Sequence, residues 1–199
     1  MDTKEKIVQV AFNLFLTKGY KDISLREIVE KVGLTKGAFY HYYKSKEELF
    51  TEVVERYVLD ISDAIYDNLP KDNLKTFMTG YLSMLVKFID QTILNASSFG
   101  EKDSVTYYNL IFEAMRLLPG FNEKIHEVHR REREAWVEVI RNAKASGEIV
   151  TSFDANSLAK LFICSNDGIG MHVILEGRLK ELYQEISGVW NGIYKLIEA

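Results

Sequence analysis

The chain has 199 residues and a formal net charge of −4, and 47% of its residues are hydrophobic. This length and composition indicate a soluble globular protein, with room for one large domain or for a small head and a larger body. No apolar run approaches the roughly 18 residues that span a bilayer. The N-terminus has no signal-peptide core, and the single cysteine excludes an internal disulfide or a cysteine metal cluster. We therefore expect a cytoplasmic protein without a membrane partner.

Apolar residues recur at helical spacing from the start of the chain, as in Ile7, Ala11 and Phe15. Residues spaced by three or four positions lie on one face of a helix. In chain order this pattern predicts helices over residues 3–18, 25–32, 36–42, 46–69, 73–94, 104–118, 122–146, 155–176 and 179–197, with a polar loop over 95–103. Alternation of period two is missing, so we predict an all-α fold of about nine helices.

Several helix ends are marked by their residue types. Ser24 with Glu27, and Ser45 with Glu48, have the spacing of capping boxes, in which serine and glutamate side chains bond to each other's backbone N–H groups. Gly19 is a typical C-terminal stop. The helix that begins after Ser45 continues without a flexible linker, so we divide the chain into a head, residues 1–46, and a body, residues 47–199. We expect this helix to carry a change in the body to the head.

The three short helices of the head have the arrangement of a helix-turn-helix unit. A glycine-containing turn separates the second helix from the third, and such a unit places its last helix in the major groove of DNA. Residues 17–46 carry seven basic and three acidic side chains, so this stretch has a net charge of +4 and the remainder −8. A basic head can approach phosphate while the acidic body is repelled, which predicts double-stranded DNA as a partner.

Residues 33–49 read GLTKGAFYHYYKSKEEL, and this run resembles the DNA-binding head of the TetR family of transcriptional regulators. The resemblance extends over residues 7–50. The family usually has phenylalanine where this chain has Tyr43, so we expect a core aromatic ring whose hydroxyl reaches solvent. The resemblance implies a helical ligand-binding body and, as the usual mode of the family, repression of transcription.

Four residues of the head are predicted to contact the DNA backbone. Ser24 and Thr35 lie at helix N-termini, where backbone N–H groups and the helix dipole favour a phosphate. Lys46 begins the next helix and is expected to meet a phosphate in the same way, and the Tyr42 hydroxyl is a further donor. Contacts of this kind position the protein and carry no sequence information.

Four other residues are predicted to lie nearest the bases. Lys36 can donate to guanine O6 and N7, and His41 has both a donor and an acceptor. Gly37 and Tyr40 are expected to make close backbone or apolar contacts, for example with a thymine methyl group. Core packing is the alternative for Tyr40, and it is the interpretation that we adopt for Phe39.

The last two predicted helices carry apolar stripes that exceed what one small core requires: Leu158, Leu161, Phe162 and Ile169 on one, and Leu182, Ile186, Trp190 and Ile193 on the other. The resemblance implies that these two helices form a symmetric four-helix interface between two copies of the chain. A homodimer places its two heads on half-sites about 34–36 Å apart, or a multiple of that distance. We therefore expect a palindromic operator.

The body contains large and polar side chains that together are typical of a site for a small, largely apolar or aromatic effector. The candidate effector residues are Phe77, Tyr81, Tyr108, Phe112, Met115, Trp136, Asn166 and Asp167. Ordinary core packing is the alternative for each aromatic residue. Asn166 and Asp167 interrupt an apolar helix, and buried polar groups need partners, which an effector, the neighbouring backbone or a dimer interface could supply.

Two alternative functions remain at this point. A constitutive, architectural DNA-binding protein would have a filled body without an effector site. A helical metal-dependent enzyme could use His126 and His129 with Glu132 or Glu134, but the interleaved arginines favour a solvated face of salt bridges. The chain has no phosphate-binding glycine loop and no nucleophile motif, so we expect no enzyme activity, no cofactor and no bound metal.

Overall fold

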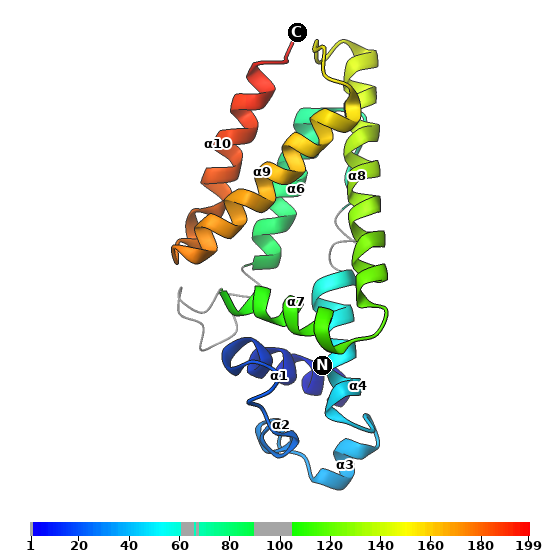
Figure 1. Cartoon of the computed structure of the whole chain (residues 1–199), viewed down its shortest axis with the longest axis vertical. Coiled ribbons are helices and arrows are strands. Elements are labelled where there is room, and N and C mark those ends of the chain that lie inside the picture. Colours follow the sequence, from blue (N-terminus) through cyan, green and yellow to red (C-terminus); the bar gives the residue numbers. More distant parts are fainter. Residues whose placement is uncertain (1, 61–65, 67, 90–104) are drawn as a thin grey trace. The chain divides into compact units, whose positions relative to one another are not determined.

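The computed structural model describes residues 2–60, 66, 68–89 and 105–199 of the chain (Figure 1). These residues form nine α-helices, a π-helical turn and a short 3-10 turn, and among them we find no strand, only an isolated bridge between Ile149 and Glu198. The prediction of an all-α fold with about nine helices is confirmed. The predicted loop over 95–103, and the parts of predicted helices at 61–65, 67 and 90–94, lie outside the described residues.

Two compact units divide the chain. The first contains Met1–Ile61 and Ala96–Ile125, and the second contains Ser62–Asn95 and His126–Ala199. The first unit therefore includes the predicted head together with a helix from later in the chain. The functional boundary at residue 46 stays a prediction, because a division by packing does not test it.

The first unit contains α1 (Thr3–Lys18), α2 (Leu25–Val32), α3 (Lys36–Tyr40), α4 (Lys46–Val54) and α7 (Val105–Leu117). The helix α1 packs against α2, α4 and α7. The helix α3 ends two residues earlier than predicted, so that His41 and Tyr42 lie in a turn. At Glu55 the chain passes from α4 into the π-helical turn Glu55–Leu59, which interrupts the uniform helix that we predicted from Lys46 onward.

The N-termini of α2 and α4 are capped, but each has only one of the two hydrogen bonds of its predicted capping box. The Ser24 hydroxyl accepts the Glu27 N–H at 3.2 Å and the Ser45 hydroxyl accepts the Glu48 N–H at 3.1 Å. The reciprocal bonds differ from the prediction, because each glutamate finds another donor: Glu27 binds the Lys18 ammonium at 2.5 Å and Glu48 accepts the backbone N–H of Lys44 at 2.6 Å. The serine caps alone therefore begin these helices.

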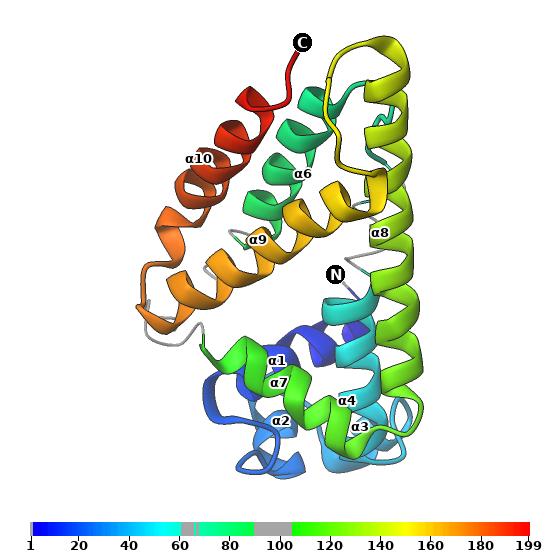
Figure 2. The ribbon, with the colours of Figure 1, turned by 45° about the horizontal axis from the view of Figure 1, so that its top comes forward.

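The second unit contains α6 (Leu74–Phe88), most of α8 (Phe121–Ser146), α9 (Ala155–Leu175) and α10 (Leu182–Lys195). The helix α10 packs along α9 and also contacts α6 (Figure 2). The last predicted helix begins instead as a 3-10 turn, Leu179–Glu181, before it becomes α10. Asp154 caps α9, since its carboxylate accepts the N–H groups of Asn156 and Ser157 at 2.9 and 3.0 Å.

Aromatic rings fill the centre of the second unit. Trp136 lies with its ring centroid 4.9 Å from that of Phe77, 5.0 Å from that of Phe162 and 5.0 Å from that of Trp190. These four side chains are at most 1% exposed. The Trp190 indole N–H donates to the Ser165 hydroxyl at 3.1 Å, so the polar atom of the ring has a partner inside the core.

The helix α9 is apolar on more than its buried side. It is long and apolar enough to pass a simple test for a membrane span, with a mean hydropathy of 1.2, but only 28% of the tested window is buried in the fold. Core helices of soluble proteins pass the same test when they are mostly buried. Here one side of α9 packs against α10, while Leu161 and Leu175 of α9 are 43% and 65% exposed.

Candidate nucleic-acid interface and effector site

Four of the predicted DNA contacts lie together on one exposed surface of the head. Lys36 and Gly37 begin α3, while Tyr40 and His41 follow four residues later, so the four positions share one side of the helix. All four are exposed, and Tyr40 is 47% accessible. Phe39 is fully buried and holds α3 to the core. The packing prediction for Phe39 is therefore confirmed, and Tyr40 lies outside the core.

Gly37 has no packing role within the head. A Cβ atom at this position would meet nothing within 4 Å, although glycine inside a helix costs about 1 kcal/mol relative to alanine. A small residue is useful there if an external surface approaches the helix backbone closely.

The predicted backbone contacts surround this surface. Ser24 and Thr35 cap α2 and α3, and each hydroxyl oxygen accepts a backbone N–H at 3.2 Å. A hydroxyl that accepts one bond can still donate its own hydrogen, here to a phosphate oxygen. Tyr42 is 40% exposed in the turn after α3, so its hydroxyl is accessible to a phosphate as well.

The Lys46 side chain makes hydrogen bonds within the head, so it is not free to contact a phosphate. Its ammonium donates to the carbonyl oxygens of Tyr20 and Ile23 at 2.8 and 2.7 Å, and it lies 4.0 Å from the centroid of the Tyr20 ring. Burial lowers the pKa of Lys46. The ammonium is therefore used inside the head, and the predicted phosphate contact depends on the backbone N–H in the first turn of α4.

The turn between α1 and α2 is held by two further side chains that the sequence analysis did not identify. The Tyr20 hydroxyl donates to Glu47 at 3.0 Å, and the Tyr20 backbone N–H donates to the Glu113 carboxylate of α7 at 2.8 Å. Burial, followed by these carboxylates, raises the pKa of Tyr20. Glu113 is 93 residues away from Tyr20 in sequence, and no local pattern could indicate this contact.

The prediction for Tyr43 is wrong in part. Its ring lies in the core, as expected, in contact with Phe39 at a centroid distance of 5.7 Å. The residue is only 2% exposed and its hydroxyl is buried, so the hydroxyl does not reach solvent. Burial raises the pKa of Tyr43.

The eight predicted effector residues belong to both units. Phe77, Tyr81, Trp136, Asn166 and Asp167 lie in the second unit, where Phe77 and Trp136 belong to the packed aromatic core. The other three, Tyr108, Phe112 and Met115, lie on α7 in the first unit, and Phe112 and Met115 are 57% and 48% exposed. An effector contact by any of the eight stays a prediction.

A connected group of polar side chains borders the aromatic core of the second unit. The Tyr66 hydroxyl donates to Glu132 of α8, and the Asn166 amide donates to the Tyr81 hydroxyl at 3.2 Å and to Asp167 at 3.3 Å. We call these five residues the polar cluster. Burial raises the pKa of Glu132 to about 7, partly offset by the Tyr66 hydrogen bond, and burial also raises the pKa of Asp167.

Glu132 thus differs from the histidines with which it was considered as a metal ligand. His126 and His129 are exposed on α8, and among the described residues no three metal-binding side chains gather in one place. The pattern of interleaved charges in α8 could not separate the partly buried Glu132 from its exposed neighbour Glu134, which pairs with Arg130 at 2.5 Å.

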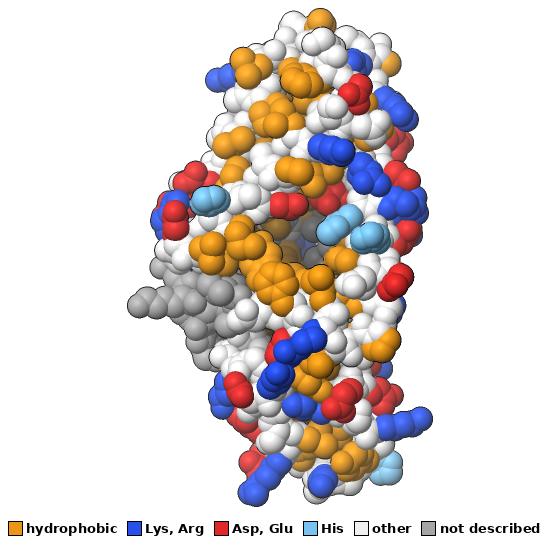
Figure 3. All heavy atoms as spheres, in the orientation of Figure 1, with side chains coloured by type: hydrophobic (Ala, Val, Ile, Leu, Met, Phe, Trp, Pro, Cys, Tyr) orange, Lys and Arg blue, Asp and Glu red, His pale blue; other side chains and the backbone are white. Residues whose placement is uncertain are grey.

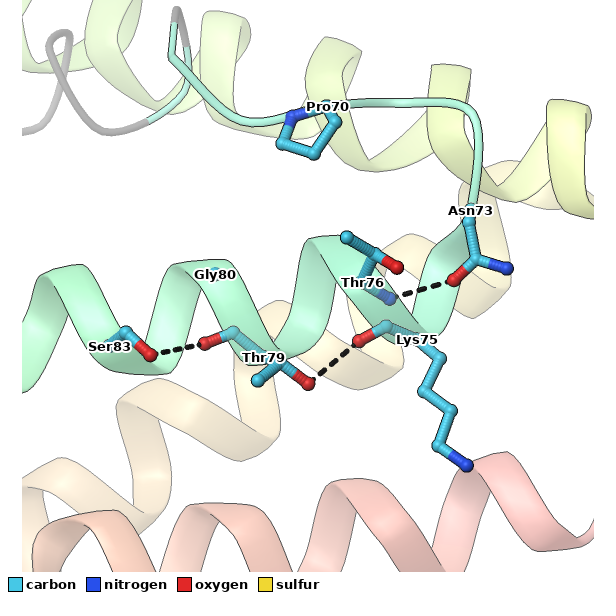
Figure 4. Close-up of a pocket in the computed structure, with 7 residues that line it drawn as sticks. All are labelled: Pro70, Asn73, Lys75, Thr76, Thr79, Gly80 and Ser83. Carbon is cyan, nitrogen blue, oxygen red and sulfur yellow. Dashed lines mark hydrogen bonds between the residues drawn. The ribbon is translucent and has the colours of Figure 1, made fainter.

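The second unit also has two open surface grooves of about 410 and 400 Å³. In the first groove, the hydroxyls of Thr79 and Ser83 donate at 2.9 Å to carbonyl oxygens one turn earlier on α6 (Figure 4). Those hydroxyls are therefore already satisfied by their own helix. None of the predicted effector residues lines either groove; the second is lined by Arg133, Glu134, Val137, Glu138, Arg141, Asn142 and Asn156.

Replacing Lys46 tests its structural role. We expect Lys46→Met to lower the free energy of unfolding by about 1–3 kcal/mol, because the carbonyls of Tyr20 and Ile23 lose their donor. DNA affinity should then fall for all sequences alike. Chemical denaturation followed by circular dichroism measures the loss, with Lys44→Met at an exposed position as the control. Equal stability of the two variants would contradict the role.

Glu132 should make stability depend on pH. The pKa of its carboxyl rises from an ordinary 4.5 to about 7 in the folded chain, so the folded state binds this proton more tightly than the unfolded state does. The stabilisation is present below the unfolded pKa and is lost as the pH rises through about 7. Denaturation at several pH values should show this loss for the natural chain and a smaller one for Glu132→Gln; equal pH profiles would refute the assignment.

Comparison with known proteins agrees with these observations. Residues 7–53 match the family of bacterial regulatory proteins named tetR. The HTH-type regulator YerO of Bacillus subtilis, itself uncharacterized, is 33% identical over 81 residues, which are 37% of this chain but only 28% of YerO. The HTH-type transcriptional repressor KstR2 of Mycolicibacterium smegmatis is 24% identical over 155 residues, 77% of this chain and 70% of KstR2.

Solved structures extend the likeness of the fold to the whole chain. A transcriptional regulator from Saccharomonospora viridis in complex with choline matches with a TM-score of 0.69 and 18% identity, over 98% of this chain and 97% of that one. The helix-turn-helix head, the matched family segment and the shared all-helical fold lead to one conclusion. The chain belongs to the TetR family of bacterial transcriptional regulators.

Proposed function

We propose that this regulator is a cytoplasmic, ligand-responsive repressor, which binds a palindromic operator as a homodimer and is released by a small effector. The exposed surface of α3 carries the proposal. Lys36, Gly37, Tyr40 and His41 share that surface and are not used by the core of the head. Membership of the family excludes the alternative of a metal-dependent enzyme.

The proposed operator contacts divide by chemistry. Lys36 and His41 offer hydrogen bonds to base edges, while Gly37 and Tyr40 allow close or apolar contact with a base. Ser24, Thr35, Tyr42 and the backbone N–H of Lys46 would hold phosphates around the same helix, and such contacts set the position of the head without reading the base sequence.

A symmetric interface of α9 and α10 is the proposed dimer contact. Leu161 and Leu175 of α9 are 43% and 65% exposed, and Val189 of α10 is 42% exposed. Figure 3 shows hydrophobic side chains gathered over these two helices. Gly168 and Gly192 lie on the same helices, and a Cβ at either would meet nothing within 4 Å. Exposed apolar residues beside open glycines are suited to close packing by a second copy.

Effector release would operate by a shift of population. An effector that binds the geometry unable to hold DNA draws the dimer toward that geometry, with a coupling of typically about 1–3 kcal/mol. The choline complex of the regulator from S. viridis supports a small-molecule effector. The packed rings of Phe77 and Trp136 favour the alternative of a constitutive DNA-binding protein, which would show DNA binding that no small molecule changes.

Base readout by Lys36 can be tested without knowing the operator. Double-stranded DNA is selected from a random library by the natural protein and by Lys36→Ala, and the affinities are measured by fluorescence anisotropy. We expect Lys36→Ala to relax the preference at one position of each half-site by about 1–3 kcal/mol. Lys31→Ala, at an exposed position of α2, is the control. Uniform weakening over all sequences would show that Lys36 contacts only phosphate.

The proposed dimer interface predicts that a larger side chain at Gly192 prevents dimerisation without destabilising the folded chain. Leucine at this position has open space in a single chain and improves helix propensity by up to about 1 kcal/mol, so Gly192→Leu should fold at least as well as the natural chain. It should nevertheless dissociate into monomers, because the added side chain keeps the second copy away. Light scattering during size-exclusion chromatography reports the mass. Asn191→Leu, at an exposed position on a different side of α10, is the control, and an unchanged dimer for Gly192→Leu would exclude close packing there.

A further inference from the structure

The polar cluster contains more acceptors than donors. Its donors are the hydroxyls of Tyr66 and Tyr81 and the amide N–H groups of Asn166. The Tyr66 hydroxyl donates to Glu132, and the Asn166 amide donates to Tyr81 and Asp167. Against these stand four carboxylate oxygens and the amide oxygen of Asn166. The hydrogen bonds within the cluster cannot satisfy all of these oxygen atoms.

One acceptor is left without any partner. The Asn166 amide oxygen is buried and has no hydrogen bond among the described residues, although the nitrogen of the same amide makes two. A buried polar atom without a partner costs about 1–3 kcal/mol. Such an atom beside a partly buried carboxylate points to a missing donor.

No cation within the described part of the chain supplies that donor. No described Lys or Arg forms an ion pair with Glu132 or Asp167, although the neighbouring acidic residues of α8 pair with arginines. The charge of His129 favours the ionised form of Asp167, but this effect is smaller than that of burial. An uncompensated carboxylate in a partly buried position is unfavourable. A ligand with a positively charged N–H group would compensate this carboxylate and would also supply the donor that the Asn166 amide oxygen lacks.

We propose that the polar cluster selects an effector that carries a cationic nitrogen with N–H donors, a protonated amine or a guanidinium group. This inference rests on the proposed ligand-responsive function and narrows its effector. The N–H groups would donate to Glu132 and to the Asn166 amide oxygen. Asp167 is the more exposed of the two acidic residues, and its carboxylate would attract the cation from solvent.

Aromatic side chains lie beside the polar cluster. The Tyr66 and Tyr81 rings stack at a centroid distance of 5.9 Å, and the Tyr81 ring lies 5.3 Å from Trp190. Aromatic faces stabilise both an apolar body and a nearby cation. The effector is therefore an organic cation with an apolar or aromatic part, and a neutral or anionic analogue of the same shape would leave the carboxylate without compensation.

Cation binding should strengthen as Glu132 loses its proton. The groups that face it are the Tyr66 and Tyr81 hydroxyls, which stay protonated because burial raises the pKa of each, Asp167 on α9, and His129 on α8. Burial holds the pKa of Glu132 at about 7, and an amine must displace this proton at lower pH. The affinity for an amine should increase from about pH 6 to about pH 8.

Matched small molecules provide the test. The full-length protein is titrated with 2-phenylethylamine, 2-phenylethanol and phenylacetate, and with hexylamine and hexanol, at millimolar concentrations. Thermal shift and the fluorescence of the tryptophans near Tyr81 report binding. We expect each amine to bind at least about tenfold more tightly than its alcohol, which is 1.4 kcal/mol, and phenylacetate not to bind. Glu132→Gln should lose the preference, and Glu134→Gln, an exposed residue of the same helix, should keep it.

The outcomes separate this inference from the proposed function. Equal binding of amines and alcohols, binding of no amine, or an unchanged preference in Glu132→Gln would overturn the cationic effector. DNA selected from a random library by the natural protein tests the repressor function independently. Selection of a palindrome together with a failed amine test would reject only the inference, whereas failure to select any DNA would reject the proposed function itself.

Discussion

The turn between α1 and α2 is the constraint on which the DNA-binding surface depends. Its carbonyl oxygens at Tyr20 and Ile23 face inward, where they need donors, and the Lys46 ammonium supplies both hydrogen bonds. The same turn is tied to α7 by Glu113. Because α2 and α3 follow directly from this turn, the positions of Lys36 and His41 depend on a lysine whose ammonium is used inside the head.

A different constraint operates in the second unit. Close packing of Trp136, Phe162 and Trp190 leaves little freedom at its centre, and the polar cluster lies against this rigid group through Tyr81. Rigid aromatic packing beside an acceptor that has no hydrogen-bond partner is a suitable arrangement for selection among small molecules, because the polar atoms cannot rearrange to satisfy one another. Stability and recognition would then compete at Glu132, which is partly buried and yet available to a cation.

Much of the fold and of the nucleic-acid interface follows from local patterns. The spacing of Ile7, Ala11 and Phe15 describes one helix face, and the caps at Ser24, Thr35 and Ser45 each act within three residues. Interactions between residues this close in the chain can be predicted from the sequence. The exact ends of helices cannot be predicted in this way. The helix α3 ends at Tyr40, because the packing of Phe39 and Tyr43 decides the last turn of this short helix.

The all-α class, most of the helices, the helix-turn-helix motif and the residues exposed on α3 could be predicted from the sequence, since all of these follow from neighbours within one or two turns. Packing between helices places the Lys46 ammonium inside the head, brings Glu113 to a turn 93 residues away, and gathers Tyr66, Glu132 and Asn166 beside the aromatic core. Such contacts join helices that are far apart in the chain, and the order of the helices does not show which of them pack together. Charge patterns could not separate Glu132 from Glu134 for the same reason: burial is a property of the packed helices.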